Sequence, residues 1–247
     1  MEPDEYGRMF DAEDALWWYR ALRLYLGDAL DRARLPRDAR VLDVGCGSGG
    51  NLAMLAERYS RAAGCDLAEE AVRLCRTRGL ARVLTADLNH LPFRTGAFDA
   101  VLASDVFESR EVDEAAAIAE IARVTRPGGR VILTVAAFQF LLSEHDAAVH
   151  SVRRYTRARA RRAFAAGALD IVRMSYLFGL FFPPIALYRL ARRRRGGPEP
   201  PGRSDVFLPP RPVNTALFAA ARAERALARA VRLPLGTTLL VELVRRV

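Results

Sequence analysis

The sequence predicts an α/β protein built on a doubly wound, mostly parallel sheet. Short apolar strands alternate with helical patterns from residue 40 to residue 136, a spacing that implies βαβ units. A glycine-rich turn directly follows the first of these strands. Right-handed crossovers place the carboxyl ends of such strands on one edge of the sheet. The 247 residues are enough for one well-buried domain with an elaborated cap.

The elements follow in order along the chain. An amphipathic helix is expected at 14–34, with apolar side chains recurring near one face at Trp17, Trp18, Leu22, Leu26 and Leu30. Five strands are then expected at 40–44, 62–66, 82–85, 98–103 and 130–136. The helices between them are expected at 50–58, 69–78 and 111–125. Pro127-Gly128-Gly129 is a breaker before the fifth strand.

The pattern becomes less regular after residue 136. We expect a polar and aromatic insertion at 137–155, a helix at 156–166, a strand at 168–176, a loop at 196–212, a helix at 213–231 and a final strand in GTTLLVELV at 236–244. This divides a single domain, 1–247, into an N-terminal aromatic helix (1–37), a cofactor-binding core (38–136), a substrate-side insertion (137–155), a helical cap (177–234) and the final strand (235–247).

Charge is unevenly distributed along the chain. Residues 1–150 hold 18 Arg and 24 acidic residues, whereas residues 151–247 hold 20 Arg and 5 acidic residues. The basic part favours an anionic partner, although the absence of lysine indicates that some of the arginine is compositional. The three cysteines form no C-x-x-C pair, and the acidic N-terminus lacks an apolar segment. We therefore expect reduced thiols, no secretory signal and a cytoplasmic location.

The stretch VLDVGCGSGG, residues 41–50, carries the first functional signal. Glycines after a strand let a ligand approach the backbone, and they expose N–H groups at a helix start. The order G-x-G-x-G-G differs from the G-x-G-x-x-G of dinucleotide-binding domains. Asp66 ends the second strand and would bind ribose hydroxyls in either case. On this turn alone, a dehydrogenase remains open beside other nucleotide-binding proteins.

Three further features follow at the strand ends. They are Ala86-Asp87-Leu88, Phe98-Asp99-Ala100-Val101 leading to Ser104-Asp105, and Arg126-Pro127-Gly128-Gly129. In this order, the set resembles the class I S-adenosylmethionine-dependent methyltransferases over roughly residues 38–136. The resemblance implies a Rossmann-like seven-stranded sheet whose last strand is antiparallel and lies beside the fifth. It also implies a helical cap inserted between the last two strands.

The same resemblance assigns the cofactor and its site. The cofactor is S-adenosylmethionine, and its product is S-adenosylhomocysteine. The glycine turn would lie against its amino-acid part, Asp66 would bind the ribose, and the adenine would lie between Leu67 and the acid of the third strand end. The implied cofactor-binding residues are Gly45, Cys46, Gly47, Gly49, Asp66, Leu67, Asp87, Leu88, Ser104 and Asp105.

The insertion narrows the resemblance. Ser143-Glu144-His145-Asp146, followed by His150 and Arg153-Arg154-Tyr155-Thr156, is similar to a bacterial subgroup with an S-x-H-D…H-x-R-R-Y-T signature. This subgroup resemblance implies a role in natural-product, polysaccharide or lipid biosynthesis. The sequence departs from the subgroup at Phe107-Glu108-Ser109, where Glu-His is common, so no role can be carried over for that histidine.

The two insertions are expected to roof the acceptor site, because both follow strands at their carboxyl ends. A roof that excludes water and aligns the nucleophile with the sulfonium methyl provides most of what methyl transfer needs. His145 and His150 are candidate general bases, with loop fixation as the alternative. The expected substrate contacts are Trp18, Tyr19, Phe138, Arg154 and Tyr155. No cluster of ligands suggests a metal.

The segment 176–195 is apolar, but Pro183-Pro184 breaks it, and it is too short to span a bilayer. Because Arg192–Arg195 follow at once, it either covers the pocket or lies on an anionic membrane surface. We expect methyl transfer by direct displacement to a small-molecule or lipid-linked acceptor. The alternatives are an RNA methyltransferase that uses the basic region and a non-catalytic cofactor-binding protein. RNA is disfavoured because no RNA-binding module appears.

Overall fold

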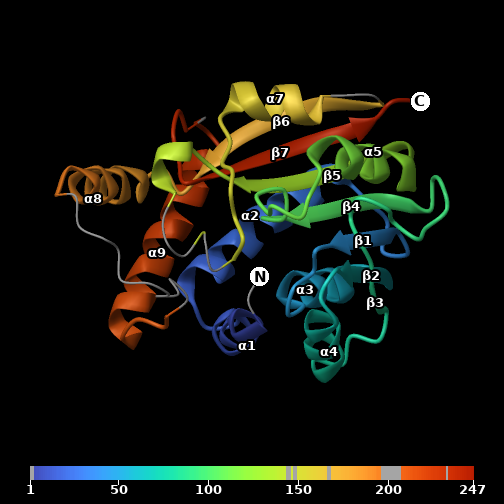
Figure 1. Ribbon diagram of the computed structural model, residues 1–247, viewed down its shortest axis with the longest axis horizontal. Helices are drawn as coiled ribbons and strands as arrows, with labels where there is room; N and C mark the ends of the chain where they lie inside the picture. The colour runs from blue at the N-terminus through green and yellow to red at the C-terminus, as the bar shows by residue number, and fades with distance from the viewer. Residues whose placement is uncertain (1–2, 143–145, 147–148, 166–167, 196–206, 232) are drawn as a thin grey trace.

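The computed structural model describes residues 3–142, 146, 149–165, 168–195, 207–231 and 233–247. Seven strands form one sheet in the order β3-β2-β1-β4-β5-β7-β6, with helices packed on both faces (Figure 1). The strands are β1 (Arg40–Val44), β2 (Arg61–Asp66), β3 (Val83–Thr85), β4 (Phe98–Ser104), β5 (Thr125–Ala136), β6 (Leu169–Leu177) and β7 (Thr238–Arg245).

The helices connect these strands along the chain. They are α1 (Pro3–Ala12), α2 (Trp17–Ala33), α3 (Gly50–Arg58), α4 (Glu69–Thr77), α5 (Glu114–Val124), the 3₁₀ turn η1 (Gln139–Leu141), α7 (Arg157–Phe164), α8 (Phe182–Arg195) and α9 (Arg211–Ala228). In the described part of the chain, none of these helices combines the length and apolarity that crossing a membrane requires.

The pairing of the strands confirms the predicted topology. β1 pairs in parallel with β2 and β4, β2 with β3, and β4 with β5. β7 runs antiparallel between β5 and β6, and α8 and α9 are inserted between β6 and β7. The first five strands and β6 therefore end at one edge of the sheet, where the glycine turn and the two insertions also lie.

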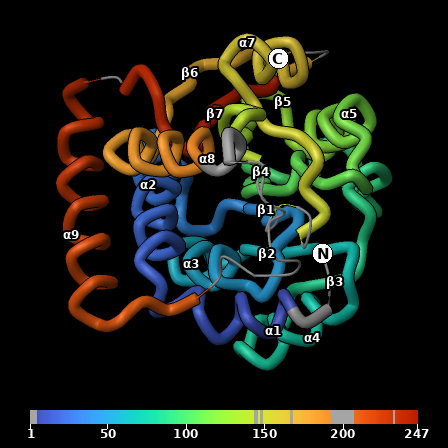
Figure 2. The backbone as a smooth tube through the Cα atoms, turned by 60° about the vertical axis from the view of Figure 1, so that its left-hand side comes forward, coloured from blue at the N-terminus to red at the C-terminus, as the bar shows by residue number. Residues whose placement is uncertain are grey.

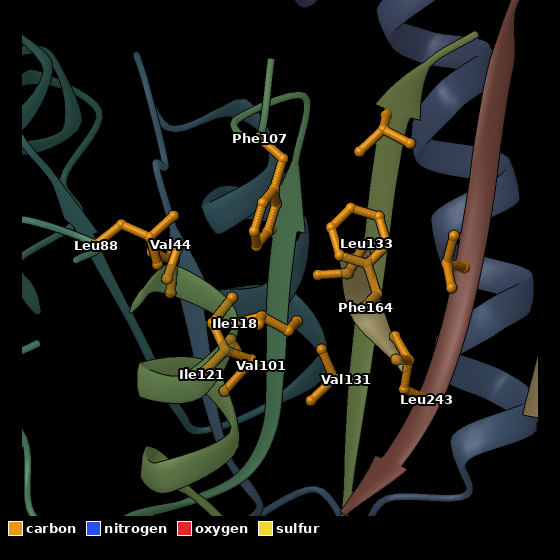
Figure 3. Close-up of a cluster of buried hydrophobic side chains, with 14 of the residues drawn as sticks. Val44, Leu88, Val101, Phe107, Ile118, Ile121, Val131, Leu133, Phe164 and Leu243 are labelled. Atoms are coloured by element: carbon orange, nitrogen blue, oxygen red, sulfur yellow. The ribbon is translucent and has the colours of Figure 1, made fainter. Parts of the chain in front are cut away.

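The central strands are apolar on both faces, as strands covered by helices on both sides must be. Alternate side chains point to opposite faces, so Val131 and Leu133 pack with α5 and α7, whereas Ile132 packs with α2 and α3. Figure 3 shows the first of these clusters, in which Phe107 and Phe164 meet edge to face at 4.9 Å between ring centroids. This two-sided core fixes the sheet edge on which the site is built.

Helices α1 and α2 and strand β5 differ from the sequence prediction. Residues 3–12 form helix α1, which the prediction did not include, and α2 begins at Trp17 rather than at residue 14. The fifth strand begins at Thr125 because the Pro-Gly-Gly segment continues it through a bulge: Phe98 pairs with Thr125, whereas Ala100 already pairs with Arg130. The breaker therefore bends this strand instead of preceding it.

The helical insertion after β6 divides into two parts with different positions. Helix α9 packs along α2, where the Tyr25 hydroxyl donates to Glu224 Oε1 at 2.9 Å and Arg225 pairs with Asp28 at 2.6 Å. Helix α8 instead contacts η1 at the carboxyl edge of the sheet (Figures 1 and 2). Of the predicted cap, α8 is the part that lies beside the candidate site.

Candidate cofactor and acceptor site

The glycine turn between β1 and α3 has a backbone that suits glycine. Gly45 and Gly47 have φ values of +68° and +53°, in the left-handed region that side chains disfavour. A Cβ atom at Gly45 would clash with Val106 Cγ2, and one at Gly47 would lie 2.6 Å from Met9 Cε. Gly49 caps α3, so the turn leads directly into the N–H groups of a helix start.

Asp66, the last residue of β2, holds this turn in place. Its Oδ2 accepts the Gly47 N–H at 2.9 Å, and its Oδ1 accepts the Ala68 N–H at 3.0 Å and the Tyr6 hydroxyl at 3.4 Å. Burial raises the pKa of Asp66, and the backbone hydrogen bonds oppose that rise. A carboxylate accepts about four hydrogen bonds, so capacity remains for a ribose hydroxyl. The glycine turn and this donor-acceptor set fit an adenosine-containing cofactor.

The neighbouring strand ends carry Leu67 and Asp87, the apolar and the acidic side chain that the sequence predicts for the adenine. Leu67 is 51% exposed, which is unusual for a large apolar residue that follows a buried strand. The Asp87 carboxylate accepts the Asn89 N–H at 2.8 Å and keeps its other oxygen towards solvent and His90. Leu88, also predicted to contact the adenine, has its side chain in the core.

Cys46 lies inside the glycine turn and is buried. Its Sγ is 3.8 Å from Cys75 Sγ, and this contact, together with burial, raises the pKa of the Cys46 thiol. A thiol whose pKa is raised is a poor nucleophile. The side chain therefore serves packing beneath the cofactor position.

The N-terminal segment closes over the turn, which the sequence analysis did not foresee. Glu13 is buried and accepts hydrogen bonds from Ser48 Oγ at 2.5 Å and from Arg78 Nη2 at 2.6 Å. Tyr6 and Met9 reach Asp66 and Gly47 from helix α1. The spacing of Tyr6, Met9 and Glu13 is that of one helix face, and this spacing is the sequence signal from which the N-terminal helix could have been predicted.

Polar side chains form a floor at the ends of β4 and β5. Ser104 Oγ lies 2.8 Å from Thr134 Oγ1 and 3.4 Å from Asp105 Oδ2. Asp105 has φ +54°, an uncommon conformation for a residue other than glycine. Its side chain is exposed, and the partial loss of water around it raises the pKa of Asp105, while hydrogen bonds from Thr134 and Ser104 oppose that rise.

Aromatic side chains lie at the same sheet edge and form what we call the aromatic roof: Phe138, Phe140, Tyr176 and Phe182. Phe138 stacks on Tyr176 at 5.2 Å between ring centroids and lies 5.2 Å from Phe182, the first residue of α8. Phe140 lies 5.8 Å from Phe138. The insertion after β5, the end of β6 and α8 therefore meet in an apolar cluster.

Trp18 and Tyr19, from the start of α2, lie near these groups. The Trp18 ring stacks on Phe178 at 6.0 Å between ring centroids, and burial raises the pKa of the Tyr19 hydroxyl, to which the charges of Glu13 and then Asp105 add. Both side chains are half-buried. The structure thus brings Trp18, Tyr19 and Phe138 to the edge where the sequence places the acceptor.

The other predicted substrate residues are held by protein partners. Arg154 makes a bidentate ion pair with Asp146, with Nη2 at 2.8 and 2.9 Å from the two carboxylate oxygens. Tyr155 is fully buried, and its hydroxyl lies 2.5 Å from Glu114 Oε1 and 3.0 Å from Phe107 O. Both side chains anchor the insertion onto the core.

Of the two candidate general bases, only His150 lies among the residues that the structure describes. His150 has its Nδ1 atom 3.0 Å from Glu111 Oε1, and its backbone has φ +57°. His145 lies outside the described residues. Among the residues that the structure describes, no three His, Cys, Asp or Glu side chains gather where they could hold a metal ion.

The sheet order and the glycine turn define a class of fold, the Rossmann-like fold that class I S-adenosylmethionine-dependent methyltransferases share. Residues 42–133 match the family model described as a methyltransferase domain, and S-adenosylmethionine is the cofactor of this enzyme class. These residues run from β1 into β5, so the matched segment contains the glycine turn, Asp66, Asp87 and Asp105.

Curated relatives carry the same segment. The chain is 38% identical over 135 residues to a malonyl-[acyl-carrier protein] O-methyltransferase of Geobacter sulfurreducens, covering 51% of this chain and 50% of that one. It is 34% identical over 132 residues to a demethylmenaquinone methyltransferase of Beutenbergia cavernae, covering 53% and 54%. It is 35% identical over 116 residues to a tRNA (carboxymethyluridine(34)-5-O)-methyltransferase of Xenopus tropicalis, covering 46% and 18%. The chain thus spans about half or less of these relatives' lengths.

Solved structures share the whole fold. Geranyl diphosphate C-methyltransferase from Streptomyces coelicolor, in complex with S-adenosyl-L-homocysteine, has a TM-score of 0.59 at 19% identity, over 93% of this chain and 79% of that one. A [4+2]-cyclase has a TM-score of 0.60 at 23% identity, over 93% and 83%. The second neighbour bears the name of a different activity, so the fold alone does not define the reaction.

Proposed function

We propose that the protein transfers a methyl group from S-adenosylmethionine to a small-molecule or lipid-linked acceptor, by direct displacement beneath the aromatic roof. The carrying observation is that the apolar cluster of Phe138, Tyr176 and Phe182 and the polar floor of Ser104 and Asp105 lie at the same carboxyl edge of the sheet. This arrangement suits an acceptor with an apolar body and one polar reacting group. The names of the malonyl-carrier and demethylmenaquinone relatives support such an acceptor.

The roles proposed for the chain's own residues are positional. The glycine turn and Asp66 would hold the cofactor, and Leu67 and Asp87 would orient its adenine. The cofactor supplies an activated methyl group on a positively charged sulfur. The roof would exclude water and align the acceptor, for which a base is needed where the reacting group is a hydroxyl or amine. His145 and His150 remain proposed for that role or for fixing the insertion.

The experiment that tests this function follows the transfer of a labelled methyl group. Protein is incubated with S-adenosylmethionine labelled in its methyl group and, separately, with a lipid extract, a polar metabolite pool and total RNA. We expect label in the lipid or metabolite fraction and none with a Gly47→Val variant. Label in RNA would instead support the RNA methyltransferase alternative, which the tRNA relative and the basic residues 151–247 favour. Binding of S-adenosylhomocysteine without transfer to any pool would support a non-catalytic protein.

A lipid-linked acceptor would be met at a membrane, and helix α8 has a surface suited to one. It packs inward through Phe182 and Ala186, while the side chains on its other sides are apolar and exposed: Ile185 37%, Leu187 70%, Tyr188 54% and Leu190 46%. Between Asp170 and Glu199 the sequence has six arginines and no acidic residue. Exposed apolar residues within a basic segment favour contact with an anionic bilayer.

The double substitution Leu187→Asp with Leu190→Asp should reduce the affinity of the protein for phosphatidylglycerol-containing vesicles, measured by flotation, by at least about 100-fold. Each apolar side chain that enters the bilayer contributes about 1.5–3 kcal/mol to membrane binding. The new negative charges also repel the anionic lipid. Val172→Asp is the matched control, because Val172 is 59% exposed but lies on edge strand β6. Equal flotation of the double variant and the wild type would show that helix α8 does not contact the membrane.

A further inference from the structure

Helix α9 has a buried face that is mostly polar. The helix runs beside α2 (Figure 2), and three of its described residues are buried: Asn214, Ala221 and Glu224. Their spacing of seven and then three residues places them on one side of the helix. A helix that only covers another helix carries apolar residues at such positions, and buried polar side chains are normally held by specific hydrogen bonds. Asn214 and Glu224 therefore indicate that α9 holds particular partners.

Asn214 holds the start of helix α2. Its Oδ1 atom accepts the Trp17 N–H at 2.9 Å, and its Nδ2 atom donates to the Ala15 carbonyl oxygen at 2.9 Å. The first N–H groups of a helix have no partner within the helix, and the residue before α2 provides no side-chain cap. Asn214 supplies a hydrogen-bond acceptor for this helix start from a distant part of the chain. Trp18 and Tyr19, the predicted contacts of the methyl acceptor, follow directly.

Glu224 holds the segment that joins β6 to α8, which we call the β6–α8 junction (residues 178–181). Its Oε2 atom accepts the Leu180 N–H at 2.7 Å, and its Oε1 atom accepts the Tyr25 hydroxyl at 2.9 Å. Glu224 is buried, and hydrogen bonds to a charged group are the stronger ones in proteins. One side chain of α9 thus ties the junction to α2.

The β6–α8 junction is a constrained turn whose geometry depends on its surroundings. Phe178 has φ +61°, a conformation that persists only when neighbouring contacts hold it. Gly179 is packed so closely that a Cβ atom there would lie 2.9 Å from the Leu235 carbonyl oxygen. The Phe182 N–H donates to the Gly179 carbonyl oxygen at 3.2 Å. Because Phe182 begins α8 and belongs to the aromatic roof, the junction determines where this part of the roof lies.

The two segments that α9 holds also pack against each other. Trp17 lies 4.6 Å from Phe181 and 6.0 Å from Phe178 between ring centroids. Trp18 stacks on Phe178. Trp17 and Trp18 are the two tryptophans of the sequence. Tryptophan emission therefore reports the contact between the start of α2 and the β6–α8 junction.

We propose that Asn214 and Glu224 are positioning residues that determine which methyl acceptors the protein uses. Each acts through a backbone N–H group, one at the start of α2 and one in the β6–α8 junction. Helix α9 thereby fixes Trp18 and Tyr19 relative to the aromatic roof, and this relative position sets the shape of the acceptor site. The inference rests on the proposed methyl transfer beneath the roof, and it goes beyond that function by placing a determinant of specificity in α9.

Glu224→Ala tests the hold on the junction. The substitution leaves the Leu180 N–H without its acceptor, so tryptophan emission should shift to longer wavelength and acrylamide should quench it more strongly. Glu224→Gln should restore the wild-type emission, because its amide oxygen can accept the Leu180 N–H and its amide nitrogen can donate to the Tyr25 hydroxyl. Asn214→Ala should produce the same change from the other end of α9, and it carries the test if Glu224→Ala does not fold.

Arg225→Ala is the matched control within the same interface. Arg225 pairs with Asp28 at 2.6 Å, so its loss weakens the packing of α9 on α2 while the hydrogen bonds of Asn214 and Glu224 remain. This variant should have a lower melting temperature and unchanged tryptophan emission. All four variants should bind S-adenosylhomocysteine with a Kd within about twofold of the wild type, because separate sites contribute independently.

Specificity is measured on the labelled products. Each variant is incubated with methyl-labelled S-adenosylmethionine and the lipid extract or metabolite pool, and the products are separated by chromatography. In the two alanine variants, label in the wild-type product should fall by about tenfold, as expected for one lost hydrogen bond, and label should appear in compounds that the wild type does not methylate. Glu224→Gln and Arg225→Ala should label the wild-type product alone. A protein that is only less stable loses label without changing its products.

The outcomes separate this inference from the function beneath it. Unchanged tryptophan emission in both alanine variants would show that α9 does not hold the two segments. A wild-type product pattern in variants whose emission has changed would overturn the role in specificity. New products with Arg225→Ala, or a Glu224→Gln variant that behaves as Glu224→Ala, would overturn the assignment to these hydrogen bonds. Absence of label in every pool with the wild type would instead overturn the proposed function, and the emission of the variants would still decide whether α9 holds the two segments.

Discussion

Gly47→Val is expected to abolish measurable binding of S-adenosylhomocysteine. Gly47 has φ +53°, and a β-branched residue is strongly disfavoured there, at roughly 1–2 kcal/mol or more. Its Cβ would lie 2.6 Å from Met9 Cε and would fill the space beside the backbone where the cofactor is expected. We expect the Kd from calorimetry to rise by at least about 100-fold, which corresponds to ~2.8 kcal/mol.

Gly79→Val is the matched control for this substitution. Gly79 has φ +82° and open space around its would-be Cβ, and it follows α4 rather than the cofactor turn. It shares the backbone penalty and should lower the melting temperature while leaving the Kd within about twofold. Comparable loss of binding in the two variants would mean that general destabilisation of the protein, and not a change in the glycine turn, explains the effect.

Asp66→Ala is expected to have the second largest effect. The substitution removes the carboxylate proposed to bind the ribose and leaves the Gly47 and Ala68 N–H groups without their acceptor. A buried donor left unsatisfied costs about 1–3 kcal/mol, so the turn loses order as well as a contact. The affinity for S-adenosylhomocysteine should fall on the order of 100-fold.

Asp170→Ala controls for the loss of a carboxylate, because Asp170 forms an exposed ion pair with Arg246 far along the chain. Exposed pairs contribute little, so its affinity for the ligand should not change. Unchanged binding by the Asp66 variant would show that Asp66 does not bind the ribose, so another residue would have to hold the cofactor.

The sheet and the cofactor end were predictable because their signals are local in sequence. The glycine turn, the acid after β2 and the alternation of strands and helices each occupy a few consecutive residues. The antiparallel last strand came from a family resemblance, and the pairing of Ile132 with Glu242 confirms it. These signals reflect what the local backbone conformation requires of the residues, so they can be recognised in a single sequence.

The acceptor end was less predictable because its residues are defined by contacts between distant segments. Tyr155 reads as a polar contact in sequence, yet it is fully buried because Glu114 and Phe107 accept its hydroxyl. Glu108 reads as an ordinary loop acid until residues 151–152 enclose it. Helix α1 was missed because its acidic residues hide a weak helical spacing of Tyr6 and Met9, and the partner of that face, Leu74, lies far along the chain.

The position of β7 has a consequence for how the chain reaches this structure. Strand β6 has no hydrogen-bonded neighbour other than β7 in the described sheet, and residues 178–237 separate the two. During synthesis, β6 must wait with its edge unpaired until those residues have been made. Strands β1 to β5 can assemble earlier, since the pairings β1–β2, β2–β3, β1–β4 and β4–β5 need no residue beyond Ala136. The cofactor half can thus form first, and the acceptor half is completed late, so the interval between them is when this protein is most exposed to misassociation.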